Sequence, residues 1–169
     1  MKRWLHSVTP LLVSLLLVSG CDLGREREIR LPDPAEAAAR YGPAAEAALS
    51  GNLLEVRMVM AESLLSRGGV IWARSGPYFY LFSPPTQELF TEYPDLAAVR
   101  VVVVTEDADE VARAQLVRDA LNEPRWRQAL RLSAVAQQTG TERPRTLEEL
   151  TYFGEEHTEF RYDPEYAGN

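Results

Sequence analysis

Few side chains in this 169-residue chain have the types and spacing that catalysis requires. The sequence contains two histidines, His6 and His157, and one cysteine, Cys21. A Ser-His-Asp or Cys-His arrangement needs a histidine beside its nucleophile, and the serines of the chain lack the glycine pattern of a nucleophile elbow. We therefore predict no serine-type hydrolysis and assign no catalytic residue.

Two acidic segments are the only ones that invite a metal-binding interpretation. Residues 155–159 place three glutamates around His157, but a zinc site needs three or four ligands with defined spacing, so a solvated polar turn is favoured. Residues 106–110 lack the central glycine and terminal glutamate of a twelve-residue calcium loop. No metal and no cofactor is predicted.

Phosphate-binding patterns are missing as well. Gly68-Gly69 is not followed by the Lys-Ser/Thr of a P-loop, and no GxGxxG follows a strand-like segment. Arg125, Arg127 and Arg131 could hold a carboxylate or a phosphate. The adjacent Glu123 favours a surface ion-pair face instead.

Four aromatic residues are the best remaining candidates for binding: Trp72, Tyr78, Tyr80 and Phe82. Such side chains are enriched at protein interfaces, although they are also ordinary core material. We predict that they present an aromatic surface to a partner. An open, flat arrangement of Tyr78 and Tyr80 would support this interpretation.

A different hypothesis is a small-ligand site or an enzyme site assembled from scattered polar residues. It would lie around Arg74, Tyr80 and His157. A closed pocket in which arginines and carboxylates converge would support this alternative.

The stretch Leu11–Cys21 determines where we expect the protein to reside. It is an apolar run that ends in Val18-Ser19-Gly20-Cys21 and follows Lys2 and Arg3. A basic start, a short apolar core and small residues are typical of a secretory signal, and the core is too short for a membrane span of ~20 residues. Here the chain resembles the bacterial lipoprotein precursors, whose lipobox is an aliphatic residue, two small residues and a cysteine. The resemblance covers residues 1–21.

The resemblance implies a lipid anchor. Cys21 would receive a diacylglyceryl group, residues 1–20 would be removed, and the new amino group would be acylated, so that two or three acyl chains hold the protein at a membrane. Asp22 resembles the sorting signal that keeps enteric lipoproteins on the inner membrane. We therefore expect the protein at the inner membrane facing the periplasm, with the outer membrane as the alternative.

The net charge of the chain limits the kinds of partner that we expect. The net charge is −7, and loss of Lys2 and Arg3 with residues 1–20 would make it −9. Such a chain repels a phosphate backbone, and no basic cluster interleaved with aromatics is present, so nucleic acid is not an expected partner. A negatively charged chain is not attracted to anionic lipids, so the acyl chains on Cys21 are the expected membrane contact.

We expect residues 21–34 to form a flexible tether and residues 35–169 to form a single domain. Residues 35–49 predict two short helices broken at Gly42-Pro43. Residues 53–66 predict a helix, although alternating apolar residues from Leu54 to Met60 also fit a strand.

Two further strands and a turn are predicted at residues 70–82, with the turn at 75–77. The valines at 99–104 predict a strand buried on both faces in the middle of a sheet. Further predicted elements are a helix over 107–121, a helix over 124–138, a short helix beginning near 146 and an edge strand at 160–162.

The expected fold is α+β: a small mixed or antiparallel sheet, with a hairpin and a central strand, packed with several helices. The expected function is a lipid-anchored periplasmic protein. It would be a non-catalytic binding or scaffolding accessory of an envelope assembly, with an envelope protein as its partner.

Overall fold

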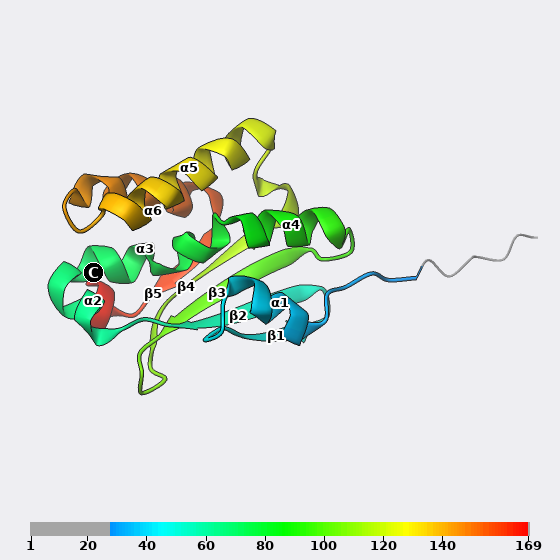
Figure 1. Ribbon diagram of the computed structural model, residues 1–169, viewed down its shortest axis with the longest axis horizontal. Helices are drawn as coiled ribbons and strands as arrows, with labels where there is room; N and C mark the ends of the chain where they lie inside the picture. Colours follow the sequence, from blue (N-terminus) through cyan, green and yellow to red (C-terminus); the bar gives the residue numbers. More distant parts are fainter. Residues whose placement is uncertain (1–27, 169) are drawn as a thin grey trace, which may run out of the picture.

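A computed structural model describes residues 28–168, apart from the side chains of residues 67 and 68. Its centre is a five-stranded mixed sheet in the order β1-β2-β3-β4-β5, and only the β2–β3 pair is parallel (Figure 1). The predicted α+β fold is therefore confirmed. The strands are β1 (Glu46–Ser50), β2 (Leu53–Val59), β3 (Ala98–Val104), β4 (Glu110–Val117) and β5 (Glu159–Tyr162).

The helices form two layers over one face of the sheet. Helix α3 packs against β3 and β4 from above, and α5 and α6 pack on the other side of α3 (Figure 1). The α-helices are α1 (Pro34–Tyr41), α2 (Glu62–Gly68), α3 (Val70–Leu81), α4 (Pro84–Glu92), α5 (Glu123–Thr139), α6 (Pro144–His157) and α7 (Pro164–Ala167). None of the helices within residues 28–168 is both long enough and apolar enough to cross a membrane.

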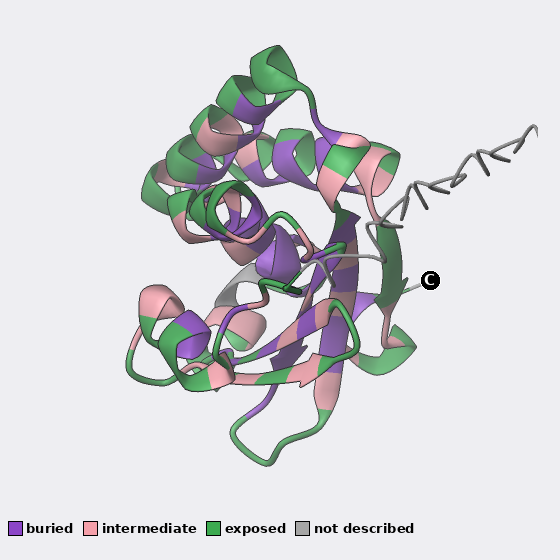
Figure 2. Ribbon diagram, turned by 90° about the vertical axis from the view of Figure 1, so that its right-hand side faces the viewer, coloured by how far each residue is buried: buried purple, intermediate pink, exposed green. Residues whose placement is uncertain are grey.

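The core lies between the sheet and α3. On β3, Val99, Val101 and Val103 enter this core, and the alternating residues face the opposite side, where Arg100 pairs with Glu55 at 3.2 Å. Buried residues gather in the central strands and in the helices against them, whereas exposed residues follow the outer helices (Figure 2). The predicted central position of this strand is confirmed.

The hairpin predicted at residues 70–82 is wrong, because this segment is helix α3. Eight of its twelve residues are buried, since the helix lies between the sheet and the outer helices and needs apolar side chains on nearly every side. A helix buried all round shows no amphipathic period. Gly76 lies against the sheet: a Cβ there would be 2.6 Å from Met60 Cε, so glycine permits the close approach.

Two helices predicted before α3 are strands. The second short helix within residues 35–49 is β1, and the helix over 53–66 is β2 followed by α2. The alternative pattern was the right one for β2, because Leu54, Val56, Met58 and Met60 all enter the core. Only α1, which ends before Gly42, agrees with the prediction for residues 35–49.

The helix predicted over 107–121 is also wrong, because residues 110–117 form β4. The acidic residues lie in the loop between β3 and β4, where the Thr105 N–H donates to the Asp109 carbonyl at 2.9 Å and Ala108 has a φ of 69°. Along β4, Ala112, Ala114 and Leu116 enter the core. Alanine, arginine and glutamine are common in helices, so the composition of this segment favoured a helix although its apolar residues alternate as in a strand.

Two predictions for the second half of the chain are confirmed. Helix α5 covers the predicted residues 124–138, and the Asn122 side chain caps it by accepting the Arg125 N–H at 3.1 Å. The short strand β5 lies at the edge of the sheet. Helix α6 is longer than expected and ends at His157, so Glu155 and Glu156 lie in its last turn and not in a polar loop.

Gly154→Ala is expected to destabilise the fold by about 1–2 kcal/mol. A Cβ at this position would lie 2.4 Å from the Tyr78 ring, and both residues are buried. Overpacking costs about 1–3 kcal/mol, and the better helix propensity of alanine returns up to about 1 kcal/mol. Urea unfolding measures the loss, and Ala134→Gly at an exposed position of α5 measures propensity alone. A stabilised Gly154→Ala variant would contradict the close packing of α6 on Tyr78.

Candidate functional site

The predicted lipid anchor lies outside the described residues. Cys21 and the sorting residue Asp22 both precede residue 28, where the described chain begins. Their roles remain predictions from the sequence.

The predicted aromatic face is not formed in this structure. Tyr78 and Phe82 are fully buried and their rings stack at 5.8 Å, and Trp72 is 9% exposed. These three side chains belong to the core because the segment is a helix enclosed between two layers. Tyr80 alone remains half-buried, and it lines a cleft described below.

Arg74, Tyr80 and His157 do not form one site. The Arg74 guanidinium pairs with Glu155 and lies 5.1 Å from the centre of the Tyr162 ring. His157 is held at both ring nitrogens, by Arg125 Nη1 at 2.8 Å and by the Phe153 carbonyl at 2.8 Å. This geometry fits a ring that donates from Nδ1 and accepts at Nε2, which leaves neither nitrogen free to act as a base.

Arg74 instead belongs to a structural network that joins α3, α6 and β5. The Tyr162 hydroxyl donates to Glu155 at 3.0 Å, and the hydroxyls of Tyr78 and Tyr162 lie 2.8 Å apart. Burial raises the pKa of Tyr78 to about 12 and raises the pKa of Tyr162 further. Both phenols therefore remain protonated at neutral pH.

These raised pKa values predict a delayed alkaline titration. The phenols of Tyr41 and Tyr78, each with a pKa of about 12 because of burial, ionise near pH 10 in an unfolded chain. The stability that their protonated forms contribute is complete below about pH 10 and is lost as the pH rises through about 12. Phenolate absorbance of the native protein should lag behind that of the urea-unfolded protein across this range. Coincident titration curves would contradict the burial of these phenols.

The remaining charged clusters of the sequence lie on the surface. On α5, Arg127 pairs with Glu123 at 2.5 Å, as predicted, whereas Arg125 hydrogen-bonds to His157. A hollow of about 320 Å³ on the open sheet face contains Arg100, Arg113 and Arg161. Two of these arginines pair with carboxylates, Arg100 with Glu55 and Arg113 with Glu110, so the hollow has little net charge. No three metal-ligating side chains gather anywhere in residues 28–168.

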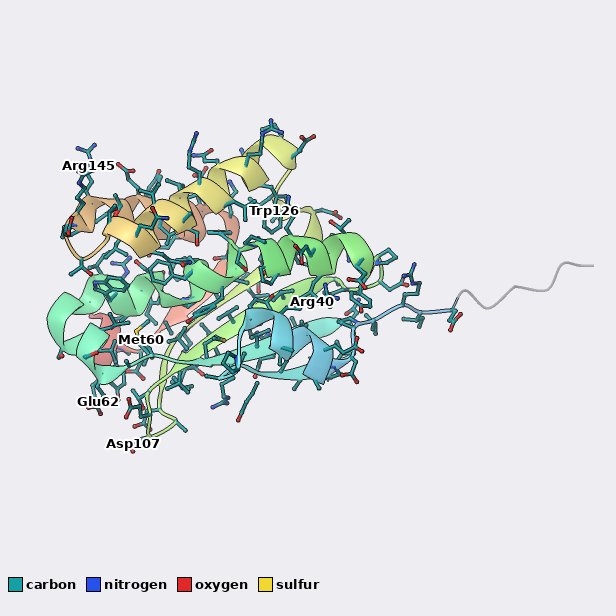
Figure 3. The ribbon with its side chains drawn as sticks, viewed as in Figure 1. Arg40, Met60, Glu62, Asp107, Trp126 and Arg145 are labelled. Atoms are coloured by element: carbon teal, nitrogen blue, oxygen red, sulfur yellow. The ribbon has the colours of Figure 1, made fainter. Side chains whose placement is uncertain are left out.

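A cleft of about 720 Å³ lies between the helices and the end of β2. Its floor is made by Met58, Met60 and Val103, at the ends of the two parallel strands, and by Trp72 and Phe79 from α3. Figure 3 labels Met60 at the end of β2 and Arg40 on α1. The other lining residues are Arg40, Tyr41, Val59, Ala61, Leu64, Tyr80, Ser83, Pro84, Pro85, Gln137 and Thr141.

Most polar groups around this cleft already have protein partners. The Tyr41 hydroxyl lies 2.8 Å from Thr86 Oγ1, and the Ser83 hydroxyl donates to the Tyr80 carbonyl at 2.5 Å. Arg40 pairs with Glu92 at 2.7 Å, and this hydrogen bond lowers the pKa of the Glu92 carboxyl. The cleft therefore offers apolar surface and little unpaired charge.

Sequence reasoning found only part of this cleft. It singled out Trp72 and Tyr80 as binding residues, but for a surface that does not exist. It did not identify Met58, Met60 or Phe79 as lining residues. The alternation of Leu54 to Met60 was the available signal, because a strand ending at Met60 places both methionines on one face.

Comparison of the chain with protein-family models, with curated proteins and with solved structures found no match. Any functional conclusion therefore depends on the cleft itself.

Proposed function

We propose that this protein is a lipid-anchored binding module of the bacterial cell envelope that holds a small, mainly apolar molecule in the cleft. The observation that carries the proposal is the cleft's size and lining. Its volume of about 720 Å³ falls within the roughly 300–1,000 Å³ of small-molecule sites, and apolar and aromatic side chains form its floor. Methionines such as Met58 and Met60 adapt their shape to varied apolar ligands.

The residues that line the cleft support binding of a ligand and not catalysis. None of the described lining residues is a carboxylate, a histidine or a cysteine, and the ionisable ones among them are Arg40, Tyr41 and Tyr80. Ser83 is not activated, because its hydroxyl donates to a backbone carbonyl and no base lies beside it. The earlier alternative of an enzyme around Arg74 and His157 has no support from these contacts, whereas a small-ligand site does, at a different place.

The membrane location is part of the proposal and follows from the lipobox resemblance. Acyl chains on Cys21 would attach the protein to the inner membrane, on its periplasmic side, or to the outer membrane as the alternative. If an envelope protein inserted an apolar side chain into the cleft, the module would be a scaffolding accessory. A dye-binding experiment distinguishes this occupant from a small molecule.

Mass spectrometry tests the anchor. The intact protein from bacterial membranes should have the mass of residues 21–169 plus two or three acyl chains. Two or three chains bind a membrane far more firmly than one, so high salt should not release the protein. An unmodified Cys21 thiol, or a chain that still begins at Met1, would contradict the anchor without affecting the cleft.

An environment-sensitive dye tests the cleft. N-phenyl-1-naphthylamine should bind the full chain in phosphatidylcholine nanodiscs saturably, with one dye per chain beyond the signal of empty nanodiscs. Binding that merely follows the amount of lipid would contradict the proposed small-molecule site. It would leave a protein partner as the occupant of the cleft.

A further inference from the structure

The Tyr80 hydroxyl is a half-buried polar group of the cleft for which the described residues supply no partner. Within residues 28–168 it makes no hydrogen bond, although the ring lines the cleft and the side chain is partly enclosed. Its own backbone carbonyl is used twice, by Ser83 and by Thr86. The hydroxyl oxygen is still reached by solvent, and a ligand that takes the place of water in the cleft can supply a hydrogen bond to it.

The other side-chain hydroxyl and amide groups of the described lining are paired or open to water. The Gln137 amide donates to the Phe79 carbonyl at 3.3 Å, and the hydroxyls of Tyr41 and Ser83 are hydrogen-bonded within the protein. Thr141 is exposed at the rim. Only the Tyr80 position therefore combines an unused hydroxyl with partial burial.

The described charges of the lining favour a neutral ligand over an ionic one. Among the side chains that the structure describes, Arg40 is the only cationic one in the lining, and it pairs with Glu92 at 2.7 Å. The first two residues of α4, Pro84 and Pro85, have no backbone N–H that could bind an anion. A carboxylate or an ammonium group would lose its hydration in the cleft without gaining a counter-charge.

We propose that the Tyr80 hydroxyl selects the ligand, and that the cleft holds a neutral, mainly apolar molecule with one hydroxyl or carbonyl group bonded to it. This inference rests on the proposed function, because it names the class of molecule that the same cleft binds. Burial also raises the pKa of Tyr80, so its phenol is protonated at neutral pH and can both donate and accept.

A matched pair of ligands tests the inference. 2-Naphthol and 2-methylnaphthalene have similar shapes and differ by a hydroxyl in place of a methyl group. Each competes with N-phenyl-1-naphthylamine for the full chain in nanodiscs, and empty nanodiscs correct for partition into lipid. Wild-type protein should bind 2-naphthol about 3- to 10-fold more tightly than 2-methylnaphthalene, which is the worth of one neutral hydrogen bond.

Tyr80→Phe removes the hydroxyl alone and should lower this preference to about 1 or below, because the 2-naphthol hydroxyl would enter the cleft without its partner. Tyr152→Phe, at a residue 73% exposed on α6, is the matched control and should keep the wild-type preference. An unchanged preference in Tyr80→Phe would overturn the role of the hydroxyl and leave the proposed function intact. If neither ligand displaces the dye from wild-type protein, the proposed function fails, and this inference fails with it. Tryptophan fluorescence of each variant verifies that it is folded.

Discussion

Ala61→Trp is expected to weaken dye binding by about tenfold or more, a loss of at least about 1.4 kcal/mol of binding free energy. Ala61 is exposed and lines the cleft between β2 and α2. An indole there would fill the space that the ligand uses, while the core beneath it stays unchanged. The substitution should alter the free energy of unfolding by no more than about 0.5 kcal/mol, as for other surface positions.

Val117→Trp is the matched control for this loss. Val117 is 45% exposed at the end of β4 and does not line the cleft. The control adds an aromatic ring to the surface without blocking the cleft, so the dye should bind as it does to wild-type protein. Equal binding by the wild type and Ala61→Trp would place the dye elsewhere and contradict the assignment of the cleft.

Arg118→Met is expected to cost about 2–4 kcal/mol of unfolding free energy, a large part of the roughly 5–15 kcal/mol typical of a domain. Arg118 follows β4, and its guanidinium donates to the carbonyls of Phe90, Tyr93 and Leu96. These carbonyls lie at the end of α4 and in the loop after it, where no helical N–H can reach them. Methionine preserves the packing but removes the Arg118 donors of the Phe90 and Leu96 carbonyls, and it leaves the Tyr93 carbonyl with the Leu96 N–H alone.

Urea unfolding measures this loss, and Arg127→Met serves as its control. Arg127 is 65% exposed and pairs only with the exposed Glu123, so its removal should change stability by no more than about 0.5 kcal/mol. Arg118→Lys should recover only part of the loss, because one ammonium group cannot reproduce the fork of a guanidinium. Similar stabilities for Arg118→Met and Arg127→Met would contradict the role of Arg118 in holding α4 to the sheet.

The sequence allowed prediction of the elements whose local pattern agrees with their place in the fold. Val101–Val104 is an uninterrupted run of valines because the strand is buried on both faces, and Asn122 with Pro124 marks the start of α5. The local sequence pattern predicted the wrong secondary structure where tertiary packing determines whether a segment is a helix or a strand. Helix α3 is apolar all round because two layers enclose it, and such a run is easily mistaken for paired strands.

The cleft could not be predicted from the sequence, for two reasons. Its lining comes from α1, β2, α2, α3, β3, α4 and α5, and from Thr141 just after α5, so it exists only once these elements have packed together. The interpretation of residues 53–66 as one helix also placed Met58 and Met60 wrongly. Tyr78 and Tyr80 are two residues apart on α3, about half a helical turn, so their side chains lie on opposite sides of the helix. Tyr78 meets Gly154 of α6, whereas Tyr80 lines the cleft beside α4.

Fluorine NMR of fluorotryptophan-labelled protein tests most directly whether the cleft binds a ligand. Trp72 lies in the cleft, whereas Trp126 packs against Phe90 between α5 and α4 (Figure 3), and a Trp72→Phe variant assigns the signals. Titration of 2-naphthol into the full chain in nanodiscs should shift the Trp72 signal saturably and leave the Trp126 signal in place. A Trp72 signal that does not move, or equal shifts of both signals, would contradict binding in the cleft.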